Sequence, residues 1–257
     1  MKGARGKIVT ITSTKGGVGK TVTALNLAGV YGYLGYKTLV VDLDLYSGCV
    51  ATYVNSDNDK TIFNLASDMS NNRYEKVEDY IYSYNEKIDI IAAPKDPRMA
   101  SKIESRYIPI LLNNVIYKYD VVILDTSHIL DEVNIVSLDN SDTILYMFTN
   151  DTFDLKNTRS FMSIMKDVNY ANYYTVLNLS VHPDKNYYSN FDMRNLIKNN
   201  IDFTISKTMH VKNIDKYILE GKILILNKSL TFTDKKDLEK FKNLALKLIE
   251  KEGNNNA

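Results

Sequence analysis

The sequence predicts an α/β protein with a doubly wound, mostly parallel sheet and helices on both faces. Along its 257 residues, short apolar runs rich in β-branched residues alternate with segments of helical periodicity. Several of these runs end at a polar residue or a glycine-rich loop, as strands of such sheets do. Hydrophobic residues make up 44% of the chain and charged residues 25%, which is typical of a globular protein. Strand–helix alternation therefore favours a parallel sheet covered on both sides.

The elements can be assigned in order along the chain. A strand through Ile8 and Ile11 precedes a helix from about Lys20 to Leu34, with Gly35 as its expected C-cap. The later strands are expected at 38–41, 119–126, 174–178, Ile88 to Ile91, Thr143 to Phe148 and Ile201 to Ile205. The later helices are expected from Arg106 to Lys118, Asp151 to Lys166 and Thr233 to Glu252.

No internal repeat or linker divides this pattern, so we expect a single domain over residues 1–252 and a disordered tail at 253–257. The polar segment from Ser67 to Lys87 is compatible with a helix, but its pattern does not decide its structure. One stripe of the last helix is apolar, which predicts core packing and disfavours stable membrane anchoring. The stripe consists of Leu238, Phe241, Leu244, Ala245, Leu248 and Ile249.

A glycine-rich loop, Lys-Gly-Gly-Val-Gly-Lys-Thr, follows the first strand at residues 15–21. Its glycines permit backbone conformations and close approaches that side chains forbid. Such a loop can turn its N–H groups toward phosphate oxygens, and the helix that begins near Gly19 adds the positive end of its dipole. Lys20 supplies a charge for the β- and γ-phosphates, and Thr21 supplies a hydroxyl for Mg²⁺. The loop predicts a nucleoside triphosphate site, although a plain glycine turn is the alternative interpretation.

The loop departs from the general pattern G-x-x-x-x-G-K-[ST], because Thr14 stands at the first glycine position and Lys15 follows it. This arrangement resembles the deviant Walker A loop of the ParA/MinD family of P-loop ATPases. The resemblance implies the P-loop NTPase fold, ATP/ADP and Mg²⁺ as ligands, and a homodimer in the ATP-bound state. It gives catalytic roles to Lys15, which would cross to the partner's phosphates, and to Lys20 and Asp44. It places nucleotide contacts at Gly16, Gly17, Val18, Gly19, Lys20, Thr21, Val22 and Asn178.

Two carboxylates follow the second apolar strand, in the segment Asp42-Leu43-Asp44. Open α/β sheets place their chemistry at such strand ends. The resemblance assigns Asp44 to the attacking water and Asp42 to the Mg²⁺ side, and it makes Leu45 to Val54 a switch region. Taken alone, the two carboxylates also fit an ordinary turn.

Two further strands end in polar residues. Asp125 fits the Walker B aspartate that holds Mg²⁺ through water, although many buried strands end in Asp. We therefore expect Thr21, Asp42 and Asp125 near the metal. The family continues with prolines after this aspartate, whereas this chain has Thr126-Ser127-His128. Asn178 carries a donor and an acceptor suited to an adenine edge, and a plain strand-ending asparagine is the alternative.

The composition of the chain excludes several classes of protein. A single cysteine, Cys49, excludes an internal disulfide framework and a cysteine-ligated cluster within one chain. No signal peptide or bilayer-length apolar run is visible, so we expect a cytoplasmic protein, with recruitment to a pole or the inner membrane surface left open. Residues 1–150 hold 15 Lys/Arg and 18 Asp/Glu, against 17 and 13 over residues 151–257. The mild excess of basic residues in 151–257 fits either a solvated surface or non-specific DNA as a partner.

The resemblance extends to other segments, such as Ile-Asp-Ile-Ile-Ala-Ala-Pro at 88–94 and Leu-Glu-Gly-Lys at 219–222. Together they are most similar to the pilus-assembly (CpaE/TadZ-like) branch. This implies a slow Mg-dependent ATPase, stimulated by an unidentified protein partner, whose dimerisation switch positions a pilus or secretion machine. One alternative is a plasmid or chromosome partition ATPase that binds DNA non-specifically. Another is a non-hydrolysing nucleotide-binding scaffold, suggested by the altered turn at residues 126–128.

Overall fold

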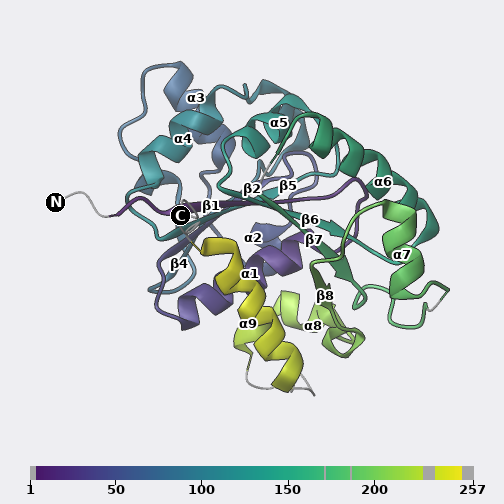
Figure 1. The fold of residues 1–257 in the computed structure, drawn as a ribbon. Helices are drawn as coiled ribbons and strands as arrows, with labels where there is room; N and C mark the ends of the chain where they lie inside the picture. Colours follow the sequence, from purple (N-terminus) through teal and green to yellow (C-terminus); the bar gives the residue numbers. More distant parts are fainter. Residues whose placement is uncertain (1–3, 171, 186, 228–234, 251–257) are drawn as a thin grey trace.

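The computed structural model describes residues 4–170, 172–185, 187–227 and 235–250. Its strands are β1 (Lys7–Thr12), β2 (Thr38–Leu43), β3 (Tyr82–Ser83), β4 (Ile88–Ile91), β5 (Val121–Thr126), β6 (Thr143–Phe148), β7 (Tyr173–Asn178) and β8 (Phe203–Ile205). They form one sheet in the order β3-β4-β2-β5-β1-β6-β7-β8, as Figure 1 shows. Every neighbouring pair is parallel except β3 and β4. The predicted doubly wound, mostly parallel sheet is confirmed.

Helices connect the strands and cover both faces of the sheet. They are α1 (Lys20–Tyr33), α2 (Val50–Tyr53), α3 (Ile62–Ser70), α4 (Tyr107–Val115), α5 (Glu132–Asp139), α6 (Thr152–Asp167), α7 (Asn190–Ile197), α8 (Ile214–Leu219) and α9 (Lys235–Ile249). Short 3₁₀ turns lie at Val77–Tyr80, Pro97–Lys102, Lys207–Met209 and Leu224–Leu226. α1, α8 and α9 lie below the sheet in Figure 1, whereas α3, α4, α5 and α6 lie above it.

The core follows from alternation along the strands. Val9 and Ile11 of β1 belong to the apolar cluster that includes α1 and α9, whereas Ile8 belongs to the cluster that includes α3 and α4. A third cluster joins β6 and β7 to α6 and α7. Strands that are buried on both faces read as continuous apolar runs, which explains why β2, β5 and β6 were easy to recognise in the sequence.

The order of the strands also positions the site. From β1 the chain crosses through α1 to β2 on one side, and β6 lies against β1 on the other. Such a reversal of direction opens a crevice at the carboxyl ends of the strands, which is where ligands bind in these sheets. The glycine-rich loop leaves β1 at this point.

Local chemistry explains where the elements differ from expectation. Within the segment from Ser67 to Lys87, α3 ends at Ser70, and a 3₁₀ turn and β3 follow. The last strand begins at Phe203 instead of Ile201. Its shortening has a direct cause, because the Asp202 carboxylate accepts hydrogen bonds from Thr175 N and Oγ1, each at 2.8 Å.

The final helix packs into the core as its apolar stripe predicts. Phe241, Leu244, Ala245 and Leu248 are buried, whereas Leu238 is 36% exposed. The Tyr31 hydroxyl of α1 donates to the Ala245 carbonyl at 2.7 Å and so ties the two helices together. The expected tail at 253–257 lies outside the described residues.

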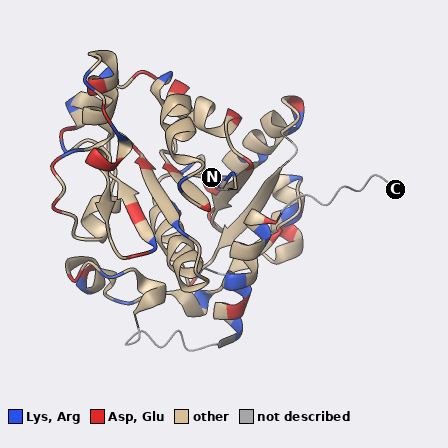
Figure 2. Cartoon of the chain, turned by 90° about the vertical axis from the view of Figure 1, so that its left-hand side faces the viewer, with Lys and Arg blue, Asp and Glu red and all other residues tan. Residues whose placement is uncertain are grey.

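Charges of both signs are distributed over helices and loops, as Figure 2 shows. Over the ranges that the structure describes, no helix is both long and apolar enough to cross a bilayer.

Candidate nucleotide site

The loop at residues 15–21 joins β1 to α1 with two glycines in left-handed conformations. Gly17 has φ +74°, and Gly19, the N-cap of α1, has φ +94°. No side chain caps this helix and no acidic residue lies in its first turn. The N–H groups of the first turn are therefore left for an anionic ligand, and the helix dipole favours one there.

Lys20 lies within the loop with its side chain largely buried, at 7% exposure. Its Nζ donates to Ser13 Oγ at 3.1 Å. Burial lowers the pKa of the Lys20 ammonium, while the charges of Asp125, Asp44 and Asp154 act in the opposite direction. A buried cation among carboxylates suits an anionic ligand with a bound metal.

Thr21 and Asp125 are brought together across the sheet. The Thr21 hydroxyl donates to Asp125 Oδ2 at 2.6 Å. The other oxygen, Asp125 Oδ1, is buried and has no hydrogen-bond partner among the described groups. Burial raises the Asp125 pKa to about 6, against the hydrogen bond from Thr21 and the charge of Lys20. An orphaned carboxylate oxygen beside a threonine hydroxyl fits the oxygen ligands of Mg²⁺.

Asp42 is also buried near Thr21 and Asp125, and its carboxylate is hydrogen-bonded to backbone N–H groups. Its two oxygens accept hydrogen bonds from Asp44 N at 3.1 Å and Val50 N at 3.0 Å. Burial raises the Asp42 pKa, and the nearby Asp125 charge raises it further. Asp42 therefore shapes the loop after β2 and places a second carboxyl group near Asp125.

Asp44 reaches the cavity wall, which Asp42 does not. Its Oδ1 accepts a hydrogen bond from Ser47 Oγ at 2.9 Å. The turn that carries these residues requires a glycine at position 48, because a Cβ there would lie 2.6 Å from Asp42 Oδ2. The loop between β2 and α2 thus holds Asp44 at the cavity wall.

Lys15 is paired within its own chain. Its Nζ lies 3.1 Å from Asp151 Oδ1, and Lys185 Nζ lies 3.2 Å from the other oxygen. Asp151 also caps α6 by accepting from Phe153 N and Asp154 N. Desolvation acts to raise the Asp151 pKa, but hydrogen bonds from the two lysines hold it below its usual range.

The turn at residues 126–128, where the resembled family has prolines, is stabilised by hydrogen bonds. Thr126 Oγ1 donates to the Ile11 carbonyl at 2.8 Å, and Asn134 Nδ2 donates to Ser127 Oγ at 2.8 Å. His128 lies at the rim of the cavity beside Gly16, whose added Cβ would be 3.6 Å from the His128 ring.

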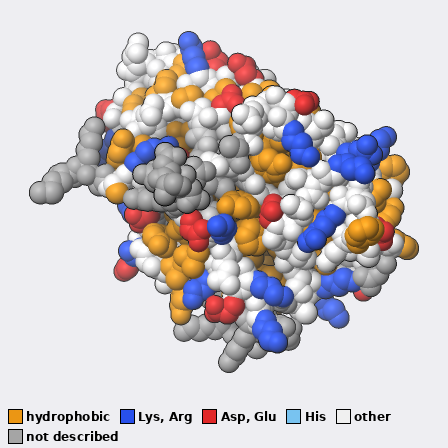
Figure 3. All heavy atoms as spheres, viewed as in Figure 1, with side chains coloured by type: hydrophobic (Ala, Val, Ile, Leu, Met, Phe, Trp, Pro, Cys, Tyr) orange, Lys and Arg blue, Asp and Glu red, His pale blue; other side chains and the backbone are white. Residues whose placement is uncertain are grey.

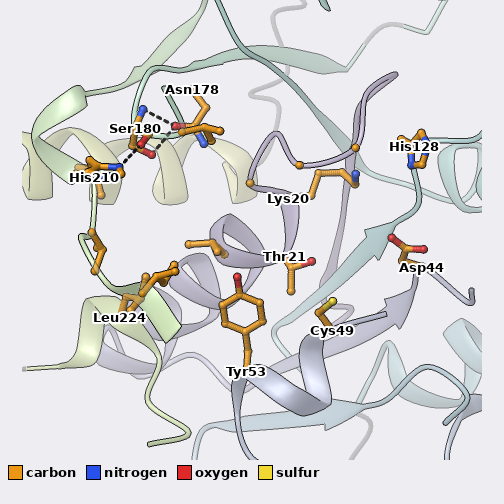
Figure 4. Close-up of a pocket in the computed structure, with 18 of the residues that line it drawn as sticks. Lys20, Thr21, Asp44, Cys49, Tyr53, His128, Asn178, Ser180, His210 and Leu224 are labelled. Atoms are coloured by element: carbon orange, nitrogen blue, oxygen red, sulfur yellow. Dashed lines mark hydrogen bonds between the residues drawn. The ribbon is translucent and has the colours of Figure 1, made fainter. Parts of the chain in front are cut away.

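A cavity of about 540 Å³ joins these groups to a second, more apolar end. Gly16, Gly17, Gly19, Lys20, Thr21 and Val22 line it. Val18, which was also expected to contact the nucleotide, does not line it: its side chain is buried and its carbonyl accepts a hydrogen bond from Asn178 Nδ2. In Figure 4, Lys20, Asp44 and His128 lie at one end, and Asn178, Ser180, His210 and Leu224 lie at the other. The volume falls in the range of small-molecule sites.

Asn178 lies at the junction of the two ends. Its Nδ2 donates to the Val18 carbonyl at 2.9 Å, and its Oδ1 accepts from Ser180 N and Oγ. Gly19 packs against it so closely that an added Cβ would lie 2.6 Å from Nδ2.

Sequence reasoning missed most of the second end. A group of residues after β8 lines the cavity there, and no motif marks it. The group consists of Met209, His210, Val211, Ile214 and Leu224. The similarity of residues 219–222 to a family segment is the one signal in the sequence that lies near this region.

The fold defines the chain as a P-loop NTPase. It belongs to the AAA domain family AAA_31, whose model matches residues 6–178. The uncharacterized protein MJECL24 of Methanocaldococcus jannaschii is 29% identical over 175 residues, which cover 64% of this chain and 67% of that protein. The tyrosine-protein kinase YwqD of Bacillus subtilis is 33% identical over 126 residues, covering 48% and 51%. The matches thus span about half to two thirds of these relatives.

Solved structures share the fold over nearly the whole chain. A ParA family ATPase from Chlorobium tepidum has a TM-score of 0.79 at 17% identity, covering 93% of this chain and 98% of that one. The cell division ATPase MinD of Pyrococcus furiosus has 0.76 at 21%, covering 95% and 98%. A putative plasmid partition protein of Borrelia burgdorferi, bound to AMPPNP, has 0.71 at 21%, covering 95% and 98%.

These comparisons confirm the expected ParA/MinD-like P-loop fold. The deviant form of the loop, the pilus-assembly branch, the dimer and the roles of individual site residues remain predictions.

Proposed function

We propose that this chain is a Mg²⁺-dependent ATPase that works as an ATP-dependent dimerisation switch. The observation that carries the proposal is the pair formed by Thr21 and Asp125. One carboxylate oxygen is hydrogen-bonded at 2.6 Å, and the other is buried without a partner next to a loop with open N–H groups. Groups arranged in this way suit a metal–triphosphate ligand.

The residues divide the work of hydrolysis among them. The loop N–H groups and Lys20 would hold the β- and γ-phosphates, and Thr21 and Asp125 would hold Mg²⁺. When bound, the metal supplies positive charge that offsets charge developing on the transferred phosphoryl group. Asp44, fixed by Ser47, would orient the attacking water, since it is the carboxylate at the cavity wall. We propose that residues 1–252 act as one ATPase domain.

The dimer part of the proposal concerns Lys15. In the single chain its ammonium is bound to Asp151. We propose that ATP-driven pairing of two chains moves Lys15 to the phosphates held by the partner subunit, and that hydrolysis, stimulated by a further protein, reverses this exchange.

The purpose would be spatial positioning of a cargo in the cytoplasm. From the resemblance of segments such as 88–94 we propose a pilus or secretion machine as that cargo. A second candidate, partition of a plasmid or chromosome, is favoured by the similarity in fold to a plasmid partition protein. Basic side chains also gather in the right-hand and lower parts of the face in Figure 3, where Figure 1 places α6 to α9. Such a surface would bind DNA non-specifically.

Measurements of ATP turnover, dimerisation and DNA binding distinguish the switch, the scaffold and the partition ATPase. We expect Mg²⁺-dependent phosphate release from the wild type that Asp44→Ala abolishes, and an ATP-dependent dimer in light scattering that Lys15→Gln weakens. Both variants should still bind ATP. Rates for the wild type that stay at background with candidate partners added would instead support the non-hydrolysing scaffold. ATP-dependent DNA binding that falls steeply with salt would favour partition.

A further inference from the structure

A chain of hydrogen bonds connects the phosphate loop to the far end of the cavity. Asn178 Nδ2 donates to the Val18 carbonyl, and Asn178 Oδ1 accepts from Ser180 N and Oγ at 3.0 and 2.7 Å. The Ser180 carbonyl in turn lies 2.7 Å from His210 Nδ1. Figure 4 shows Asn178, Ser180 and His210 in this sequence at one end of the cavity. The chain fixes the orientation of all three side chains.

The bond between Ser180 and His210 determines where the imidazole carries its proton. A carbonyl oxygen can only accept, so His210 Nδ1 must be the donor. In the neutral ring the other nitrogen, Nε2, then has a free lone pair and is a hydrogen-bond acceptor. His210 is one of the residues that line the cavity, and its side chain is exposed, so no neighbouring group covers it completely.

The remaining polar capacity at this end is small. Asn178 Oδ1 already accepts two hydrogen bonds, and only one N–H of its amide is left over. Ser180 Oγ donates its hydrogen to Asn178. The Ser180 hydroxyl oxygen keeps its own lone pairs, so two acceptors of these three side chains have no donor among the described groups, namely Ser180 Oγ and His210 Nε2.

Apolar side chains complete this end and favour a flat ring. Met209, Val211, Ile214 and Leu224 line the cavity around His210. They can cover the faces of a base, while the His210 side chain itself is exposed to solvent.

We propose that His210 selects the nucleotide by reading position 6 of the purine ring. This inference rests on the proposed function, since it concerns the base of the nucleotide whose phosphates the loop binds. The 6-amino group of adenine donates to His210 Nε2. A 6-oxo purine, such as hypoxanthine or guanine, instead presents an oxygen acceptor to the same lone pair, which leaves both groups without a partner.

Calorimetric titration with diphosphates tests this without turnover. The ligands are ADP, IDP and purine riboside diphosphate, each with Mg²⁺. We expect the wild type to bind ADP roughly 10-fold more tightly than IDP, with purine riboside diphosphate between them. His210→Phe keeps a flat ring but removes the acceptor, so the ADP:IDP ratio should fall to near 1. His210→Gln has both an amide donor and an acceptor and should restore part of the ratio.

The matched control is His128→Phe at the phosphate end, which should leave the ADP:IDP ratio unchanged. Equal affinity of the wild type for ADP and IDP would overturn the inference while leaving the ATPase proposal intact. So would a His210→Phe protein that weakens all three ligands equally, since that indicates a structural role. A wild type that binds none of the nucleotides would remove the proposed function itself.

Discussion

The two ends of the cavity are built in different ways. The phosphate end comes from a run of seven consecutive residues, 15–21, and from carboxylates that end neighbouring strands, all within the matched range 6–178. The base end is assembled from separate segments between residues 178 and 224, held by a hydrogen-bond chain and apolar contacts. The groups proposed to bind a triphosphate are thus encoded locally, whereas the groups proposed to identify the base depend on tertiary packing.

The largest effect should come from Lys20 at the phosphate end. Lys20→Ala removes a buried cation that would bind phosphate oxygens directly. Charge-assisted hydrogen bonds are worth about 1.5 to 3 kcal/mol, so ATP affinity should fall roughly 10- to 100-fold. Calorimetry with Mg-ATP measures this.

Arg98→Ala serves as the comparison for Lys20→Ala, because Arg98 pairs with Asp96 on the surface. It should leave ATP affinity unchanged. Equal affinities for the wild type and Lys20→Ala would contradict the assignment of the phosphate end.

The junction between the two ends can be tested with a matched pair of glycines. Gly19 and Gly35 have φ of +94° and +92°, but a Cβ at Gly19 would meet Asn178 Nδ2 at 2.6 Å, and one at Gly35 would meet nothing within 4 Å. Both substitutions by alanine should cost about 1 kcal/mol of backbone strain. Gly19→Ala should cost about 1 kcal/mol more, because Asn178 must give up its bond to Val18.

Denaturant unfolding gives these free energies, and nucleotide titration should detect weakened binding for Gly19→Ala alone. Equal losses of stability for the two variants would show that Asn178 does not couple the loop to the base end.

The stability of the nucleotide-free protein should depend on pH through Asp125, the carboxylate that we propose binds the metal. Burial holds the Asp125 pKa at about 6 in the folded chain, against 3.8 for an ordinary aspartate. The folded state therefore binds this proton more tightly than the unfolded state, and its contribution to stability is lost as pH rises from about 4 to 6. Asp125→Asn removes the titration, so the metal-free variant should be more stable than the wild type at pH 7, by about 1 to 3 kcal/mol.

Chemical denaturation at pH 4.5 and at pH 7, both with chelator present, provides the measurement for Asp125→Asn. We also expect Mg²⁺ with ATP to stabilise the wild type more than the variant. A variant less stable than the wild type at pH 7 would show that the carboxylate is well satisfied without a metal.

The smallest change in stability should come from Asp151→Asn, which keeps an acceptor for capping α6 but removes the charge that holds Lys15. The Lys15 and Asp151 side chains are 35% and 19% exposed, so the free energy of unfolding should change by less than about 1 kcal/mol. The fraction of dimer with ATP should rise, because Lys15 no longer has to leave an ion pair. Sedimentation velocity measures it, and Asp96→Asn is the control. An unchanged dimer fraction would show that the release of Lys15 from Asp151 does not control dimerisation.

Features that depend on residues close together in the sequence could be predicted from it. The bounds of β4 and β6 match the expected ranges, because apolar residues predominate in strands that are buried on both faces. The contact between Thr21 and Asp125 also follows, since Asp125 lies at the end of β5 and Thr21 lies in the first turn of the helix that follows the neighbouring parallel strand β1.

Features that depend on long-range packing were not predictable. Asp151 lies far from Lys15 in the sequence, and only the docking of α6 beside the loop brings them together. His210 and Leu224 carry no periodic or motif signal, because they enter the cavity from loops and short helical turns. The commitment of Asp42 to backbone N–H groups depends on the path of the turn through Gly48, which residue types alone do not specify.

Titration of the wild-type chain with ATP in the presence of Mg²⁺ is the most direct test of the account. We predict saturable binding of one nucleotide per chain, and competition by Mg-tripolyphosphate, because in our proposal the loop, Lys20 and Thr21 bind the phosphates. A chain that shows no affinity for ATP or tripolyphosphate under these conditions would contradict the assignment of the cavity as a nucleotide site.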